Sequence, residues 1–285
     1  MNPRRGFAVS RSDSHLLKTT PAVLKALGRR PLPDALELGG CRYVQNRVFK
    51  HDFFAATALY QADPPCAGGA DRVILKLQRQ APLLLIPLRW VGRILSARER
   101  AALERLAGVR GVPRFISPWG PTGLIREYIE GHTLAEVERV DDFFHPRLRE
   151  LIDAVHARNM AYVDLEKPAN VLVGEDGRPY LFDFQISWYW PRHWGGDLWP
   201  VRAVRRWLQN GDLYHLIKLQ RRSRPDQLSQ DVLAASYRKP WFVRAHNLWT
   251  RPLTRLRRRM LNWLDPRRGR GERGRISDHK LMGGA

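Results

Sequence analysis

The chain has 285 residues, 44% of them hydrophobic and 10% aromatic, which excludes a tiny cross-linked scaffold and a chain that is disordered throughout. Its formal net charge of +21 is unevenly placed: +7 over residues 1–50, −1 over residues 51–190 and +15 over residues 191–285. A neutral middle with basic ends predicts a core with its own chemistry and flanking surfaces that meet a polyanion, or basic tails that only keep the protein in solution.

The N-terminal half predicts a basic appendage, residues 1–38, followed by a β-rich lobe with one helix, residues 39–129. The appendage contains a short predicted helix and then a run of Pro and Arg that breaks regular structure. Ser96 precedes the helix of the lobe, which is expected over 97–107. The predicted strands, of which the first range forms a meander, lie at 42–60, 72–78, 113–116 and 123–129.

The C-terminal half predicts a mainly helical lobe, residues 130–264, and a disordered basic tail, residues 265–285. Apolar residues at helical spacing predict a helix from Pro146 to Asn159. Two short apolar runs flank an Asp-Gly turn and predict a hairpin over 171–184. The predicted fold class is therefore α+β, with a β-rich N-lobe and a mainly helical C-lobe.

Five polar residues follow these elements in an informative order, namely Lys76 in a strand, Glu99 in a helix, Asp164 and Asn170 in a loop, and Asp183 at a strand end. With the local sequences Tyr-Val-Asp-Leu-Glu-Lys-Pro-Ala-Asn and Asp-Phe-Gln, this order resembles the protein-kinase-like superfamily. It is similar to an atypical bacterial branch, with RIO-type Ser/Thr kinases and lipopolysaccharide core-sugar kinases. The resemblance covers roughly residues 42–187 and implies a bilobal kinase-like fold.

The resemblance also implies a role for each residue. Lys76 would hold the α- and β-phosphates of ATP, and Glu99 would pair with its ammonium. Asp164 would orient the acceptor hydroxyl, while Asn170 and Asp183 would bind Mg²⁺.

Glu99 has a competing interpretation. Ser96 and Glu99 form an S-x-x-E pattern, in which the glutamate only caps the start of a helix. We favour the ion pair with Lys76 and keep Glu104 as the fallback partner of the lysine.

Residues 124–131 resemble the kinase hinge. By that resemblance the carbonyl of Glu127 and the N–H of Ile129 would hold adenine, with Arg126 at the gatekeeper position, where an arginine is unusual. No glycine-rich loop precedes the strand lysine, and backbone N–H groups at 48–56, with Lys50, would cover the phosphates instead.

The departures from the kinase pattern define an alternative function. The missing glycine-rich loop and the Gln185 that replaces a glycine after Asp-Phe favour an inactive pseudokinase. The basic ends of the chain also allow a scaffold that binds nucleic acid or an anionic membrane. The Trp- and Arg-rich segment after residue 187 and a predicted basic amphipathic helix at 251–263 suit a membrane surface, and nucleic acid is the less favoured partner.

The two cysteines, Cys41 and Cys66, are too few for a disulfide framework and lack the paired spacing of a zinc site, which favours a reducing compartment. No apolar signal region or membrane-spanning run is recognisable in the sequence. We therefore expect a cytoplasmic kinase, with peripheral attachment to the inner membrane face as an option. It would use ATP and Mg²⁺ to phosphorylate a hydroxyl of a Ser/Thr side chain or of a glycolipid sugar.

Overall fold

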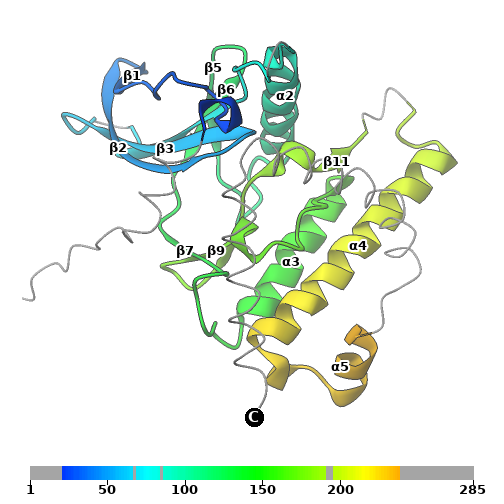
Figure 1. Cartoon of the computed structure of the whole chain (residues 1–285). Coiled ribbons are helices and arrows are strands. Elements are labelled where there is room, and N and C mark those ends of the chain that lie inside the picture. The colour runs from blue at the N-terminus through cyan, green and yellow to red at the C-terminus, as the bar shows by residue number, and fades with distance from the viewer. Residues whose placement is uncertain (1–20, 67–68, 84–85, 191–194, 238–285) are drawn as a thin grey trace, which may run out of the picture.

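The structure is a computed structural model that describes residues 21–66, 69–83, 86–190 and 195–237 (Figure 1). One lobe is built on a six-stranded antiparallel sheet in the order β1-β2-β3-β4-β6-β5, with one long helix, α2, beside it. These elements are β1 Ala35–Leu38, β2 Cys41–His51, β3 Ala55–Ala62, β4 Arg72–Gln78, α2 Arg89–Arg105, β5 Phe115–Trp119 and β6 Gly123–Glu127.

The other lobe is mainly helical. Helices α3 and α4 lie side by side, and small sheets lie between them and the first lobe (Figure 1). Its helices are α3 Phe144–Ala157, α4 Trp199–Ser223 and α5 Gln230–Tyr237, and its strands are β7 Gly131–Thr133, β8 Met160–Ala161, β9 Val171–Gly174, β10 Pro179–Leu181 and β11 Trp188–Tyr189. Short 3-10 turns complete the described chain: η1 Ala22–Leu24, η2 Pro168–Asn170, η3 Phe184–Ile186 and η5 Pro225–Gln227. The α+β, two-lobed prediction is confirmed.

The predicted appendage at 1–38 is wrong for its described part, which belongs to the N-lobe. Strand β1 is the edge strand of the sheet, and Leu27, Leu32 and Leu36 are buried in the same apolar core as the sheet residues. Arg79 at the end of β4 fixes this segment, because its guanidinium donates to the carbonyls of Phe53, Val23 and Pro82 at 2.9–3.0 Å. The lobe therefore begins well before residue 39.

Helix α2 starts at Arg89, eight residues before the predicted start. Ser96 consequently lies inside the helix, where its hydroxyl donates to the carbonyl of Gly123 at 3.3 Å. The capping-box interpretation of Ser96 and Glu99 is therefore wrong. The helix passes very close to β4, since a Cβ on Gly92 would lie 2.0 Å from the carbonyl oxygen of Arg79.

The apolar core of the C-lobe accounts for the helix and the hairpin that the sequence predicts there. Leu148, Leu151, Ile152 and Val155 recur at helical spacing along α3 and are buried, as the sequence predicted. Strands β9 and β10 form the predicted hairpin, with Val171 opposite Leu181. A separate core, made mostly of C-lobe residues, thus supports the loop between α3 and β9.

The two cysteines form a disulfide between the start of β2 and the segment after β3, with Cα atoms 6.1 Å apart, which opposes the reducing compartment expected from their number and spacing. Within the described ranges, no helix is both long and apolar enough to cross a bilayer. The predicted amphipathic helix at 251–263, the tail at 265–285 and residues 1–20 of the proposed appendage lie outside the described residues.

We predict opposite effects for two helical glycines. Gly92→Ala should lower the free energy of unfolding by about 2 kcal/mol or more, because the new methyl group overlaps the backbone of Arg79, the residue directly after β4. Gly211→Ala in α4 is the matched control: nothing lies within 4 Å of its Cβ position, so alanine should raise stability by up to about 1 kcal/mol. Urea denaturation of both variants measures this, and equal effects would contradict the close approach of α2.

Candidate active site

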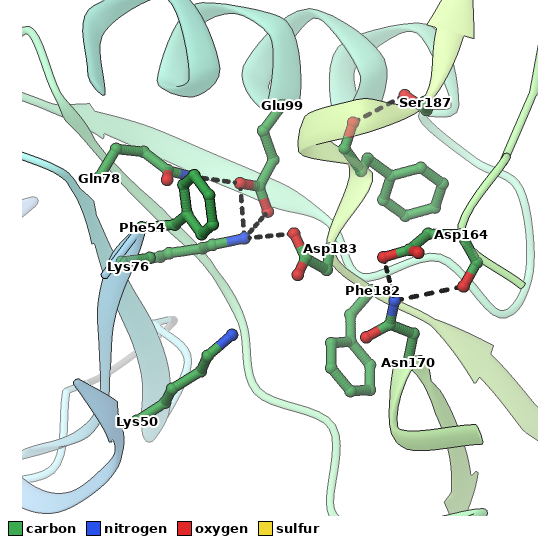
Figure 2. A network of polar contacts seen from close by, with 12 residues as sticks. Lys50, Phe54, Lys76, Gln78, Glu99, Asp164, Asn170, Phe182, Asp183 and Ser187 are labelled. Carbon is green, nitrogen blue, oxygen red and sulfur yellow. Dashed lines mark hydrogen bonds and ion pairs between the residues drawn. The ribbon is translucent and has the colours of Figure 1, made fainter. Parts of the chain in front are cut away.

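A buried ammonium group forms the centre of the candidate site. Lys76 points from β4 toward α2, and its Nζ lies 2.8 Å from Glu99 Oε2 and 2.8 Å from Asp183 Oδ1 (Figure 2). Gln78, two residues along the same strand, donates from Nε2 to Glu99 Oε2 at 2.9 Å. Residues 107 positions apart in the sequence therefore meet at one nitrogen atom.

Glu99 is the partner of Lys76, and the fallback partner Glu104 is not. The Glu99 side chain is only 1% exposed, whereas Glu104 lies on the outer surface of α2, 3.8 Å from Arg100. The predicted ion pair is thus formed by the glutamate that faces the sheet.

The three charges shift one another's pKa values. Burial opposes the charged form of Lys76, but Asp183 and Glu99 outweigh it and raise the pKa of the ammonium. Burial also opposes ionisation of Asp183, yet Lys76 lowers the pKa of this carboxyl below its ordinary value, with smaller contributions from Lys50 and Lys167. Burial raises the pKa of Glu99. The site therefore holds a firmly protonated amine beside an ionised aspartate.

Asp164 and Asn170 form a second polar group on the loop between β8 and β9. Asn170 donates from Nδ2 to Asp164 Oδ2 at 2.7 Å (Figure 2). Lys167 donates to the same oxygen at 2.7 Å. Asp164 and Asn170 are both buried, at 9% and 7% exposed. Sequence reasoning missed Lys167, although it lies inside the motif that identified the loop.

Tyr162 connects the two polar groups. Its buried hydroxyl donates to the carbonyl of Phe182 and has the carbonyl of Asn170 within 3.3 Å, so one side chain ties the loop to the residue before Asp183. Burial and the nearby carboxylates of Asp183 and Asp164 raise the pKa of this phenol well above its ordinary value. The Tyr162 hydroxyl therefore lies close enough to both aspartates for their charges to act on it.

Asp183 itself has left-handed backbone angles, φ 68° and ψ 63°. An L-residue other than glycine adopts this region at a cost, which is most often met at functional sites. The turn ends β10 and directs the Asp183 carboxylate toward Lys76, while Phe184 packs against the Tyr162 ring at 5.2 Å.

Asp212 on α4 supports the loop and was not predicted. Its carboxylate accepts the backbone N–H groups of Tyr162 at 2.8 Å and Val163 at 2.7 Å, and it lies 3.0 Å from His156 Nε2. The side chain is fully buried. The sequence does carry a signal, because Asp212 is the one acidic residue in the 25 residues of α4, which are otherwise rich in arginine.

The predicted hinge, residues 124–131, covers the end of β6, the segment after it and the first residue of β7. Arg126 extends into the region between the lobes, where its guanidinium carbon lies 5.8 Å from the centre of the Phe182 ring. Its Nη1 donates to the carbonyl of Glu127 at 3.1 Å, the atom expected to face adenine. The backbone N–H of Ile129 has no hydrogen-bond partner in the part of the chain that the structure describes.

Lys50 lies at the edge of the site on β2. Figure 2 shows its side chain directed toward the same space as Lys76, although its ammonium is half-exposed and pairs with Asp52 at 2.9 Å. The predicted phosphate-covering segment at 48–56 is thus the β2–β3 hairpin, with Lys50 as its inward cation.

The donor set fits Mg²⁺. Asn170 and Asp183 supply an amide and a carboxylate oxygen, the hard ligands that Mg²⁺ prefers, and Mg²⁺ is usually held by one or two such groups together with substrate phosphates. Across the described ranges, no cluster of three or more His, Cys, Asp and Glu side chains could hold a metal ion by itself. The residues therefore fit a metal that arrives with a phosphorylated substrate.

A cavity of about 430 Å³ lies elsewhere, between α3 and the hairpin β9–β10, and is lined by residues that include Arg110, Leu151 and Tyr180. This cavity is not lined by any of the residues of the two polar groups, namely Lys76, Glu99, Asp183, Asp164 and Asn170. The candidate site is identified from its chemistry and not from this cavity.

Comparisons with known proteins give structural neighbours only. No protein-family model matches the chain, and no curated protein matches it. Similar solved structures include the Rio2 kinase from Chaetomium thermophilum, with a TM-score of 0.48 and 15% identity over 70% of this chain and 63% of that chain. The complex of the same kinase with ADP/Mg²⁺-phosphoaspartate has a TM-score of 0.46 and 14% identity over 70% and 62%. The matched part spans less than two thirds of those proteins.

We predict that Asp212→Asn weakens the loop without removing any of the cluster residues. An asparagine has one oxygen for the two N–H groups of Tyr162 and Val163, so one donor is left facing an NH₂ group, at a cost of about 2–3 kcal/mol in unfolding free energy. Hydrogen exchange of these two amides should accelerate. Asp231→Asn, at an exposed position of α5, is the control. Unchanged protection of both amides would show that Asp212 does not hold the loop.

Proposed function

We propose that this protein is a phosphotransferase that uses Mg²⁺ and a nucleoside triphosphate to phosphorylate a hydroxyl group. The observation that carries the proposal is the pairing of Lys76 with Asp183 and of Asp164 with Asn170 in two buried polar groups that Tyr162 joins. Phosphoryl transfer depends mainly on positioning and on neutralising phosphate charge, and these groups supply a cation, two carboxylates and an amide for that purpose.

The triphosphate end of the donor would bind between β4 and the turn at Asp183. Lys76 would donate to non-bridging phosphate oxygens, with Glu99 keeping its ammonium in place, and Lys50 would approach the same oxygens from the β2–β3 hairpin. Asn170 and Asp183 would hold Mg²⁺, which neutralises phosphate charge when bound.

Asp164 would act on the acceptor. Its carboxylate is within 2.7 Å of two donors, Asn170 and Lys167, which fix its orientation. A carboxylate held in this way accepts a hydrogen bond from an incoming hydroxyl and receives its proton as the phosphoryl group is transferred. Lys167 would offset the negative charge that gathers near the transferred group.

The base would lie along residues 127–130, with ATP as the donor expected from the kinase resemblance. Ile129 presents a backbone N–H without a partner in the described chain, and the Phe182 ring lies beside Arg126 of the same predicted hinge. These features support a purine nucleotide.

The acceptor would be a Ser/Thr side chain or a glycolipid sugar. The described surface supports an acceptor near a membrane: Leu198 and Trp199 at the start of α4 are 61% and 80% exposed, and Arg202 follows on the same helix. Tryptophan and arginine together suit the headgroup region of a bilayer. A cytoplasmic protein attached to the inner membrane face remains our proposal for its location.

We predict that Asp183→Asn lowers Mg²⁺-dependent phosphate transfer at least a hundredfold, because the variant loses a metal ligand and a charged partner of Lys76. Asp153→Asn, on the exposed surface of α3, is the control and should keep full activity. Full transfer by Asp183→Asn would overturn the assignment. Nucleotide binding without transfer by the unaltered chain would identify a pseudokinase.

The acceptor class can be measured in the same assay. Donor nucleotide labelled in its γ-phosphate is added with the protein to a lysate, which is then separated into protein and lipid fractions. Label in the lipid fraction supports the glycolipid acceptor, whereas label in protein supports a Ser/Thr acceptor. Label that appears equally with Asp183→Asn does not come from this protein.

A further inference from the structure

The strongest inference beyond the proposed function concerns Arg126, and it rests on that function. Arg126 lies near the end of β6, in register with Ile74 of β4 and Phe115 of β5. Its side chain leaves the sheet toward the ring of Phe182, the residue that precedes Asp183. A base that binds along 127–130 would therefore meet this guanidinium.

The guanidinium already donates to the carbonyl that the amino group of an adenine would use. Arg126 Nη1 donates to the carbonyl of Glu127 at 3.1 Å, and the N–H of Glu127 donates to the carbonyl of Arg114 at 2.9 Å. The exocyclic amino group of an adenine placed here would face the Arg126 guanidinium, which is also a donor. The Glu127 carbonyl beside it already accepts a hydrogen bond from that guanidinium.

The same region has donors to spare. Arg126 Nε is buried and has no hydrogen-bond partner among the described residues, and neither has the backbone N–H of Ile129. A buried donor without a partner costs free energy that a ligand acceptor recovers. The local chemistry therefore favours a base that presents oxygen or unprotonated nitrogen to this side.

Burial lowers the pKa of Arg126, while the carboxylates of Glu99 and Asp183 favour its charged form. An arginine side chain stays protonated in proteins, so the group acts as a donor only. It cannot switch to accept a hydrogen bond from an amino group, as an asparagine or glutamine could.

The two purines differ on the edge concerned. Guanine presents two acceptors, O6 and N7, and a guanidinium can bind both at once, whereas adenine presents the N6 amino donor beside N7. We propose that Arg126 selects a 6-oxopurine nucleotide, so that GTP is the preferred phosphate donor of this site in place of ATP.

Binding to the unaltered chain tests the proposal. Calorimetric titration with Mg²⁺ and non-hydrolysable analogues of GTP, ITP and ATP compares bases on an identical triphosphate. Inosine has O6 and N7 but lacks the 2-amino group of guanine. We expect GTP and ITP to bind at least about tenfold more tightly than ATP, since a bidentate base contact discriminates by that order. Tighter binding of ATP, or equal binding of ITP and ATP, would overturn the proposal.

A substitution isolates the residue. Arg126→Met removes the donors and keeps an unbranched apolar stem, so the ratio of GTP to ATP affinity should fall at least tenfold, mainly through loss of GTP binding. Arg126→Lys retains the charge without the planar fork and should keep part of the preference. An unchanged ratio in Arg126→Met with an unaltered thermal melt contradicts the role of Arg126. The comparison of ITP with ATP on the unaltered chain stands even where a variant fails to fold.

The outcomes separate this inference from the function on which it rests. If none of the three nucleotides binds in the presence of Mg²⁺, the phosphotransferase proposal and the base preference both fail. If ATP binds and donates phosphate more effectively than GTP, only the base preference fails.

Discussion

Burial of the Lys76 ammonium constrains the arrangement of the whole site. Removing an ion from water costs several kcal/mol, and only close partners of opposite charge offset that cost. Lys76 is 8% exposed, and its partners come from α2 and from the turn after β10. Strand, helix and turn must therefore meet within hydrogen-bonding distance, or an unpaired charge is left in the interior. The charged residues of the site, Lys76, Glu99 and Asp183, therefore also fix how the two lobes approach each other.

The relative positions of the strand, the helix and the turn depend on residues that have no catalytic role of their own. Gly92 has no side chain, so α2 can lie against β4 and bring Glu99 to the lysine. Asp212 fixes the backbone before Asp164 through two N–H groups, and Tyr162 joins that loop to the strand that leads to Asp183. Each of these contacts acts on the backbone, which explains how a small number of buried side chains can position several reacting groups.

The sequence allows prediction of the residues that meet but not of all that brings them together. Lys76, Asp164 and Asp183 are recognisable because each stands at a definite point of a strand or loop pattern. The start of α2 was misplaced because Ser96 and Glu99 satisfy a local capping rule, and only tertiary packing at Gly92 overrides it. The docking of residues 21–38 depends on Arg79, two of whose three carbonyl partners, Phe53 and Val23, come from distant parts of the sequence. Such contacts leave no periodic signal.

Charge balance gives Arg126 a second role. Glu99 and Asp183 bring two carboxylates to one ammonium, so Lys76 alone leaves the buried cluster with an excess of negative charge. The charge of the Arg126 guanidinium interacts favourably with both carboxylates, and the group lies beside the ring of Phe182, on the side where a base would lie. Recognition of the base and stability of the phosphate-binding lysine are therefore coupled through one side chain. A substitution of Arg126 alters both the recognition of the base and the stability of the buried lysine. A change of the nucleotide's base alters only the recognition.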